Sequence, residues 1–359
     1  MSMTALGLLI LGLVLLVAGA EILVRGASKL AMLLGISPLI IGLTIVAYGT
    51  STPEMAVSLQ ASLAGDAGIS IGNVVGSNIC NVLFILGVSA MITPLLVAQQ
   101  LIKIDVPIMI GVSILLVALV QDGLLGRFDA VLLFVGAVLY TVFLFTQGRS
   151  EEVEDYDPDA VKQERRQVKV WLVNTGLIVV GIGLLTQGSS WLVEGAVAIA
   201  QSFGLSRLVI GLTIIALGTS LPEAATSIMA SVKGERDIAV GNVVGSNIFN
   251  ILAVLGVAGM FSPNGIEVSA AALHFDIPVM IAVAIACLPI FFSGNVISRW
   301  EGIVFFAYYI AYIAYVVLDA TNHDSLNLYS HVLASFVIPL TVITLFIVVS
   351  RELRERMGR

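Results

Sequence analysis

The sequence predicts an all-α polytopic membrane protein: two inverted-topology five-helix repeats, which form a ten-helix core, and one extra C-terminal transmembrane helix. Long apolar runs, an internal repeat and an odd number of spans in each copy predict it. Of the 359 residues, 58% are hydrophobic and only 11% are charged, whereas a soluble protein carries about 25% charged residues. We therefore expect the bilayer to be the solvent for most of the chain.

Eleven segments are apolar enough, over roughly 20 residues, to cross a bilayer as helices. They lie near 4–24, 36–63, 71–96, 104–121, 127–146, 169–200, 206–232, 238–261, 276–294, 299–318 and 328–349. Their apolar residues are continuous rather than alternating, which argues against a transmembrane β-barrel. No Lys or Arg precedes the first segment, so we expect a retained helix and not a cleaved signal peptide.

The basic residues predict the orientation, because cytoplasmic loops carry an excess of Lys and Arg. With the N-terminus outside, 15 of the 17 basic residues fall inside, and only Arg127 and Arg207 fall outside. We therefore expect the N-terminus outside and the C-terminus in the cytosol.

Residues 42–94 and 211–263 are copies of each other at a constant spacing of 169 residues, with 31 of 53 positions identical. Each copy belongs to a unit of five spans, so the second unit must enter the membrane with opposite polarity. Inverted repeats are common in secondary transporters, which bind substrate near the bilayer midplane between the repeats. We predict the first repeat at 1–147, a cytosolic acidic and basic linker at 148–168, the inverted repeat at 169–318, and the extra helix with a basic tail at 319–359.

The linker carries six carboxylates between Glu151 and Asp159. Its sequence DYDPDAVKQERR is similar to the start of a calcium-binding loop. However, Ala160 replaces the glycine that the loop needs at its turn, and Arg166 replaces the glutamate that would bind Ca²⁺ with both oxygens. A solvated linker is therefore expected here.

The motif GTSTPE at 49–54 recurs as GTSLPE at 218–223. Pro53 and Pro222 lack an N–H and clash with the carbonyl four residues earlier, so the helices are predicted to kink or unwind around Gly49 and Gly218. This would leave main-chain carbonyls without partners. Residues at i, i+3, i+4 and i+7 share one helical face. These faces hold Ala47, Thr50, Ser51 and Glu54 in one half, and Ala216, Thr219, Ser220 and Glu223 in the other. Their oxygens suit Ca²⁺ and Na⁺ better than soft metals.

The following helix carries GNVVGSNICN, repeated as GNVVGSNIFN, with polar residues at i, i+4 and i+8 on one face. These are Asn73, Ser77 and Asn81, and their mates Asn242, Ser246 and Asn250. For Asn73, Asn78 and their mates, binding of ions and simple helix–helix contact remain equally open. The glycine pairs Gly72/Gly76 and Gly241/Gly245 are predicted to let helices approach closely.

Glu54 and Glu223 are the strongest candidates, because a carboxylate at the bilayer centre costs roughly 2.5–3.5 kcal/mol or more and is kept for function. Asp105 and Asp276 each begin a span two residues before a proline and are predicted to be helix N-caps. The cysteines Cys80 and Cys287 and the three histidines lack zinc-ligand spacing, so no structural metal, cofactor or enzymatic activity is expected.

At both motifs the chain resembles the calcium/cation antiporter superfamily, in particular its prokaryotic sodium/calcium exchangers, and the resemblance covers 19–318. It implies ten core helices, four midplane cation sites and residence in a prokaryotic cell membrane. The basic residues lie in short loops rather than on one basic face, so no nucleic-acid partner is expected. The ligands that the resemblance implies are Ala47, Thr50, Ser51, Glu54, Ser77, Asn81, Ala216, Thr219, Ser220, Glu223, Ser246 and Asn250. The eleventh span departs from this pattern.

The resemblance implies electrogenic exchange of Na⁺ for Ca²⁺ by alternating access. Relatives that use K⁺ carry Asp where this chain has Asn250, so we expect exchange without K⁺. Calcium/proton relatives tend to carry Glu where this chain has Gly76 and Gly245, which disfavours proton coupling but leaves Ca²⁺/H⁺ antiport as the alternative. A cation channel that uses the same oxygens is a second alternative.

Overall fold

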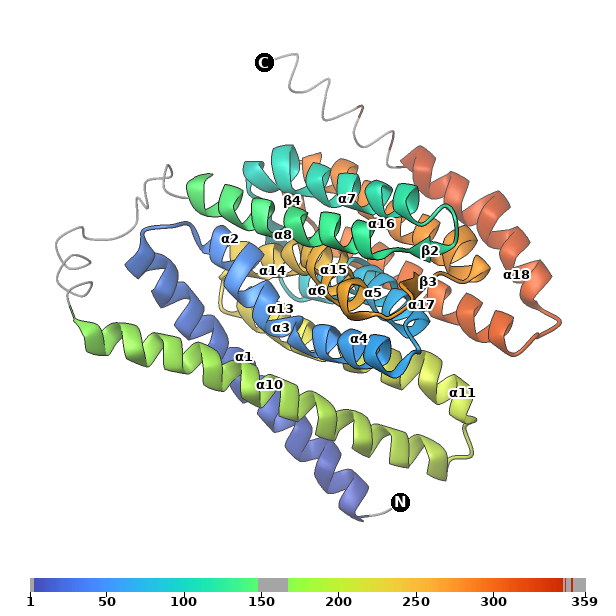
Figure 1. Cartoon of the computed structure of the whole chain (residues 1–359), viewed down its shortest axis with the longest axis horizontal. Coiled ribbons are helices and arrows are strands. Elements are labelled where there is room, and N and C mark those ends of the chain that lie inside the picture. The colour runs from blue at the N-terminus through green and yellow to red at the C-terminus, as the bar shows by residue number, and fades with distance from the viewer. Residues whose placement is uncertain (1–2, 148–166, 345, 347–349, 351–359) are drawn as a thin grey trace.

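The computed structural model describes residues 3–147, 167–344, 346 and 350. The calcium-loop-like part of the linker and the basic tail lie outside these residues. Helices make up almost every element of the described part, as Figure 1 shows, so the all-α prediction is confirmed.

Nine helices in the described part of the chain are long and apolar enough to cross a membrane. They are α1 (Met3–Leu34), Gly68–Ile92, Leu101–Leu119, α8 (Arg127–Gln147), α10 (Val168–Ser202), Arg236–Phe261, Ala272–Phe292, α17 (Arg299–Ala320) and Leu326–Thr344. Several contain a π-helical turn; for example α5 (Gly68–Cys80) continues through η2 (Asn81–Leu86) into α6 (Gly87–Ile92). The chain is therefore a multi-pass membrane protein.

The two remaining predicted spans are interrupted helices. The first comprises α2 (Pro38–Ile41), η1 (Gly42–Val46), α3 (Ala47–Thr50) and α4 (Thr52–Ala64). The second comprises α11 (Arg207–Ile210), η4 (Gly211–Ile215), α12 (Ala216–Gly218) and α13 (Leu221–Val232). Each breaks at a serine, where ψ is 10° at Ser51 and 3° at Ser220. Each serine lies two residues before the motif proline, so the predicted break is confirmed.

The helices α1 and α10 lie side by side along one edge of the molecule (Figure 1). They have 32 and 35 residues, well beyond the roughly 20 residues that span a bilayer. Glycines allow this contact: a Cβ at Gly12 would lie 2.7 Å from the Gly188 oxygen, and one at Gly19 would lie 2.9 Å from the Gly181 oxygen.

Short strands join the two halves of the chain. β1 (Leu95–Leu96) pairs antiparallel with β4 (Val296–Ile297), and β2 (Leu124–Leu125) with β3 (Ile266–Glu267). Each pair takes one strand from each half. A rotation that superposes the first half on the second would therefore place the β1–β4 pair on the β2–β3 pair. This relation is expected for a two-fold axis between the repeats.

The predicted N-cap role of Asp105 and Asp276 is wrong. The π-helical turns η3 (Leu101–Asp105) and η6 (Ala272–Asp276) already precede α7 (Val106–Leu119) and α16 (Ile277–Phe292), so both aspartates lie within helices. The wide turn accommodates the proline two residues later without ending the helix. Instead, the hydroxyl of Tyr140 donates to Asp105 at 2.9 Å, and that of Tyr312 donates to Asp276 at 3.1 Å.

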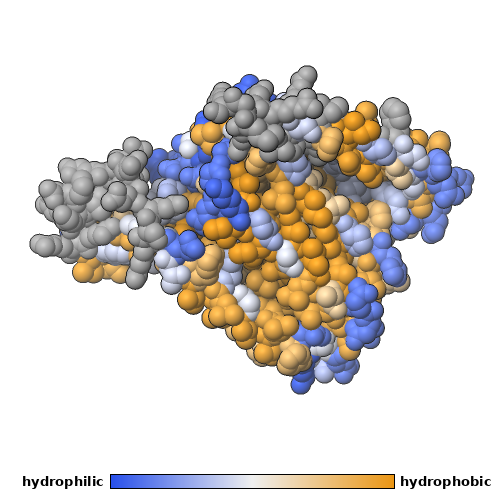
Figure 2. All heavy atoms as spheres, turned by 90° about the horizontal axis from the view of Figure 1, so that it is seen from above, coloured by the Kyte–Doolittle hydropathy of each residue, from blue (hydrophilic) through white to orange (hydrophobic). Residues whose placement is uncertain are grey.

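The remaining described helices complete the core and its surface. α14 (Arg236–Phe249), η5 (Asn250–Val254) and α15 (Leu255–Phe261) form the most buried span, whereas α18 (Leu326–Val332) and η7 (Leu333–Val337) begin the least buried one. Figure 2 shows wide apolar areas on the outer face. Exposed side chains such as Leu139 and Val179 suit contact with lipid.

Candidate functional site

Two buried glutamates from opposite halves form the centre of the candidate site. Glu54 and Glu223 lie in the first turns of α4 and α13, and their exposed fractions are 0%. A helix N-terminus favours negative charge, and the preceding proline fixes that first turn. Serines hold the carboxylates across the halves: Ser51 donates to Glu223 Oε1 at 2.8 Å, and Ser220 donates to Glu54 Oε1 at 3.4 Å.

Ser77 on α5 joins the same cluster. Its Oγ lies 3.4 Å from Glu54 Oε1 and 3.1 Å from the Ser220 Oγ. The structure therefore brings together residues that the sequence separates by up to 172 positions.

Both glutamates and three further candidate ligands have an oxygen that is buried without a hydrogen-bond partner in the described part of the chain. They are Glu54 Oε2, Glu223 Oε2, Asn81 Oδ1, Asn250 Oδ1 and Ser246 Oγ. A buried polar atom without a partner costs about 1–3 kcal/mol, so native structures rarely keep such atoms without a reason. Carboxylate, amide and hydroxyl oxygens are a suitable donor set for hard cations.

The amide oxygens of Asn81 and Asn250 are oriented by a crossed pair of asparagines. Asn81 Nδ2 donates to Asn247 Oδ1 at 2.9 Å, and Asn250 Nδ2 donates to Asn78 Oδ1 at 3.1 Å. Asn78 and Asn247 in turn donate to each other's main-chain oxygens at 3.1 and 3.4 Å. Since the nitrogens are engaged, the oxygens of Asn81 and Asn250 are the atoms left for an ion. The sequence did not reveal this positioning role; the only signal was an asparagine three positions before each candidate ligand.

Asn73 and Asn242 link the broken helices to their neighbours. Asn73 Nδ2 donates to the Glu54 main-chain oxygen at 3.2 Å, and Asn242 Nδ2 donates to that of Glu223 at 3.4 Å. Their side-chain oxygens accept hydrogen bonds from the opposite half, from Thr219 at 3.3 Å and Thr50 at 3.1 Å. Both asparagines and both threonines therefore hold the two halves together around the glutamates.

Two main-chain oxygens near the helix breaks accept hydrogen bonds. The Ala47 oxygen accepts from Ser51 N at 3.0 Å and from the Thr50 hydroxyl at 3.3 Å. The Gly218 oxygen, four residues before Pro222, accepts the hydroxyl of Ser189 on α10. A side chain thus satisfies the main-chain oxygen that Pro222 leaves without its helical donor.

The two halves differ in how closely they surround the site. A Cβ at Gly245 would lie 2.6 Å from the Leu43 oxygen and one at Gly241 2.9 Å from the Leu39 oxygen, whereas no described heavy atom lies within 4 Å of a Cβ at Gly72 or Gly76. The close helix approach predicted for both glycine pairs is therefore present at Gly241/Gly245 and not at Gly72/Gly76.

The same difference separates the mates in the broken helices. Ala47 is fully buried and Ala216 is exposed; Thr50 is buried and Thr219 only partly so. The site is thus closed along η1 and α14 and more open along η4 and α5.

Comparisons with known proteins agree with this arrangement. The family described as sodium/calcium exchanger protein matches residues 4–146 and 173–318. The putative antiporter CaxA of Alkalimonas amylolytica is 42% identical over 312 residues, which cover 84% of this chain and 95% of that protein. The sodium/calcium exchanger MaX1 of Methanosarcina acetivorans is 34% identical over 356 residues, which cover 85% and 96%. A solved structure of the sodium-calcium exchanger NCX_Mj gives a TM-score of 0.74 at 32% identity and covers 88% of this chain and 99% of that one.

Proposed function

The chain belongs to the sodium/calcium exchanger family of membrane antiporters, and we propose that it exchanges Na⁺ for Ca²⁺ across the cell membrane without requiring K⁺. The observation that carries the proposal is the pair of fully buried glutamates, each with one carboxylate oxygen unpartnered in the described part of the chain. The oxygens of Asn81, Asn250 and Ser246 are likewise buried and unpartnered there. Two carboxylates and one Ca²⁺ sum to zero charge, so a bound calcium ion removes the cost of burying both acids.

Ion gradients set the coupling ratio. Expelling Ca²⁺ against a gradient of about 10⁴ and about 100 mV costs about 10 kcal/mol, and each Na⁺ entering down a tenfold gradient returns about 3.7 kcal/mol. About three Na⁺ are therefore needed for each Ca²⁺. Three Na⁺ at two glutamates leave one positive charge where Ca²⁺ leaves none, so the exchange is electrogenic.

The difference between the halves supports alternating access. In the described state α14 packs against η1, while the matching surfaces of α5 and η4 are apart. Because the two halves carry nearly the same motif, an exchange of these arrangements has a similar energy and opens the other side of the site. Either one Ca²⁺ or several Na⁺ stabilise the occupied site, and only the ion-loaded protein changes between the inward-open and outward-open states.

A methyl group at Gly76 tests this mechanism. We expect Gly76→Ala to fold normally, because its Cβ has room in the described state. When the halves exchange arrangements, however, Gly76 must approach η4 as closely as Gly245 now approaches Leu43. An overpacked contact costs about 1–3 kcal/mol, so exchange should slow by about tenfold or more. The measurement is the initial rate of sodium-driven calcium uptake in proteoliposomes.

Gly111→Ala is the matched control, since a Cβ at Gly111 on α7 also has no described heavy atom within 4 Å. It should transport at the wild-type rate. A wild-type rate for Gly76→Ala as well would contradict the proposed closure on this side.

We further propose that the N-terminus lies outside and the C-terminus in the cytosol of a prokaryotic cell. Single cysteines in a variant without Cys80 and Cys287 test this orientation. Labels added from the cytosolic side should reach positions 150–165 and those after 351, and labels added from outside should reach 320–325. Outside labelling after 351 would contradict the crossing of the last helix.

Calcium uptake into Na⁺-loaded proteoliposomes tests the function. Uptake should require Na⁺ on the opposite side of the membrane and should carry current. Calcium uptake that is driven by a proton gradient in the absence of a Na⁺ gradient would instead identify a Ca²⁺/H⁺ antiporter. Calcium flux without any counter-ion would identify a channel.

A further inference from the structure

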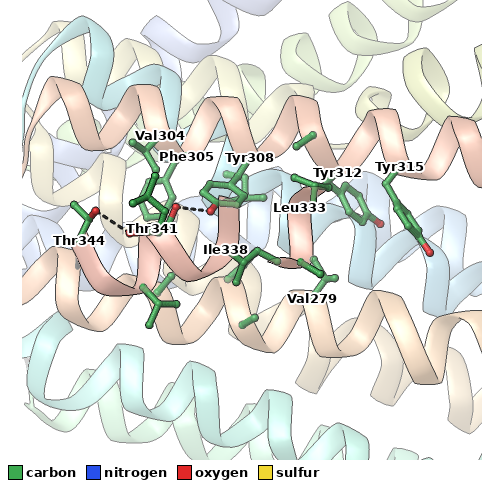
Figure 3. A pocket seen from close by; sticks show the side chains of 18 of the residues that line it. Val279, Val304, Phe305, Tyr308, Tyr312, Tyr315, Leu333, Ile338, Thr341 and Thr344 are labelled. Carbon is green, nitrogen blue, oxygen red and sulfur yellow. Dashed lines mark hydrogen bonds between the residues drawn. The ribbon is translucent and has the colours of Figure 1, made fainter. Parts of the chain in front are cut away.

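A cavity of about 610 Å³ lies between α16, α17 and the last helix, Leu326–Thr344. Figure 3 shows apolar side chains from all three helices directed into it. Those that define its walls are Val279 and Ala282 of α16, Val304 and Phe305 of α17, and Leu333 and Ile338 of the last helix. The cavity is separate from the glutamate site, and its outer wall lies beyond the residues that the family matches.

Hydrogen bonds at two levels hold the last helix beside α17. The Tyr329 hydroxyl donates to the Ala311 oxygen at 2.9 Å, and the Tyr308 hydroxyl donates to Thr341 Oγ1 at 2.6 Å (Figure 3). The long tyrosine side chains act as spacers, while small residues such as Ala282, Ala311 and Ala334 face the gap. The tyrosine bonds and the small residues therefore keep the cavity open between α17 and the last helix.

The lining favours hydrocarbon over water. A buried water needs two to four polar partners, and several polar side chains that line the cavity already have partners in the protein. Tyr308 is bonded to Thr341, and Glu301 accepts from Ser298 Oγ at 2.7 Å. The three helices are 21, 22 and 19 residues long, which is enough to cross the bilayer. Lipid tails are the surrounding solvent at that depth.

We propose that one acyl chain of a bilayer phospholipid occupies this cavity, between the last helix and the exchanger core. Its volume falls within the range of about 300–1,000 Å³ found for sites that enclose small organic ligands. A transmembrane helix of a partner does not fit, because its diameter is about 10–12 Å and the tyrosine bonds already join α17 to the last helix. Leu83 also lines the cavity. The acyl chain would therefore contact η2, the segment that begins with Asn81.

Filling the cavity tests the proposal. The double variant Ala282→Phe/Ala334→Phe places two rings where the acyl chain would lie, and Ile285→Phe on the exposed face of α16 is the control. Each full-length protein is purified in detergent, and retained phospholipid is measured by native mass spectrometry. We expect one retained phospholipid in the wild type and in the control, and at least about a fivefold lower fraction in the double variant, because the rings displace its contacts. Equal retention in the double variant, or none in the wild type, overturns the proposal.

A second measurement uses the wild-type protein and so does not depend on folding of the variant. Proteoliposomes contain phosphatidylethanolamine with a diazirine in its acyl chain; the protein is exchanged into detergent and then irradiated. Labelling should remain at Val279, which lines the cavity, and disappear at Ile285, which contacts bulk lipid. Loss at both positions, or crosslinking of Val279 to a second copy of the chain, overturns the proposal.

Discussion

Replacing either Glu54 or Glu223 with glutamine is expected to abolish calcium exchange and leave the fold intact. Glutamine keeps the volume of the side chain and one acceptor oxygen, so the bonds from Ser51 and Ser220 can persist. It loses the charge that neutralises Ca²⁺ in the buried site. Interactions of charged groups contribute about 1.5–3 kcal/mol each and Ca²⁺ engages several, so the rate should fall by about 100-fold or more. The measurement is ⁴⁵Ca²⁺ uptake into Na⁺-loaded proteoliposomes.

Glu194→Gln is the control, because Glu194 lies exposed on α10, away from the cluster. It should transport like the wild type. Thermal unfolding of the two site variants should stay near or above the wild-type temperature, since each removes one of two facing buried acids. Near-normal calcium flux in Glu54→Gln or Glu223→Gln would remove these residues from the proposed site.

The sequence was sufficient to predict most of the architecture, because the features that determine it are local. Continuous apolar runs predict the spans, and the prolines of the two motifs predict kinks around Gly49 and Gly218. The breaks lie two residues later, at Ser51 and Ser220. The helical spacing of Ser77 relative to Asn81 predicts a shared face. These arguments need no knowledge of contacts between distant segments.

The features that the sequence did not predict depend on contacts between the halves. Both copies carry the same glycines, so no local pattern could show that Gly245 packs tightly while Gly76 does not. Asn81 donates to Asn247 and Asn250 donates to Asn78, and both bonds cross between the repeats. Asn78 and Asn247 therefore orient the two candidate ligands. The proline two residues after Asp105 is typical of a helix start, but a π-helical turn extends this helix before the proline.

Calcium exchange should also proceed when K⁺ is replaced on both sides by an inert organic cation. With Ca²⁺ bound, the two glutamates are already neutralised, and an additional monovalent cation in a low-dielectric site would be uncompensated. Asn250 contributes an oxygen without charge, and its nitrogen is held by Asn78 Oδ1 at 3.1 Å. The membrane potential must be clamped by other means in this assay. If exchange stops without K⁺ and returns on its addition, the interpretation of Asn250 is wrong.

Asn250→Asp should convert this neutral site into one that prefers a further cation. The new carboxylate has no N–H to donate, so an oxygen would face Asn78 Oδ1, and Asn78 cannot simply turn because its nitrogen donates to the Asn247 oxygen. A third acid in the proposed site would leave one negative charge after Ca²⁺ binds. We expect the rate to fall by about tenfold or more, as for a lost buried hydrogen bond and an unpaired charge, and to recover in part with added monovalent cation. Asn81→Asp is the matched variant, because Asn81 donates to Asn247 Oδ1 in the same way at 2.9 Å. Wild-type rates and unchanged monovalent-ion dependence in both variants would show that these asparagines do not contribute to ion selection.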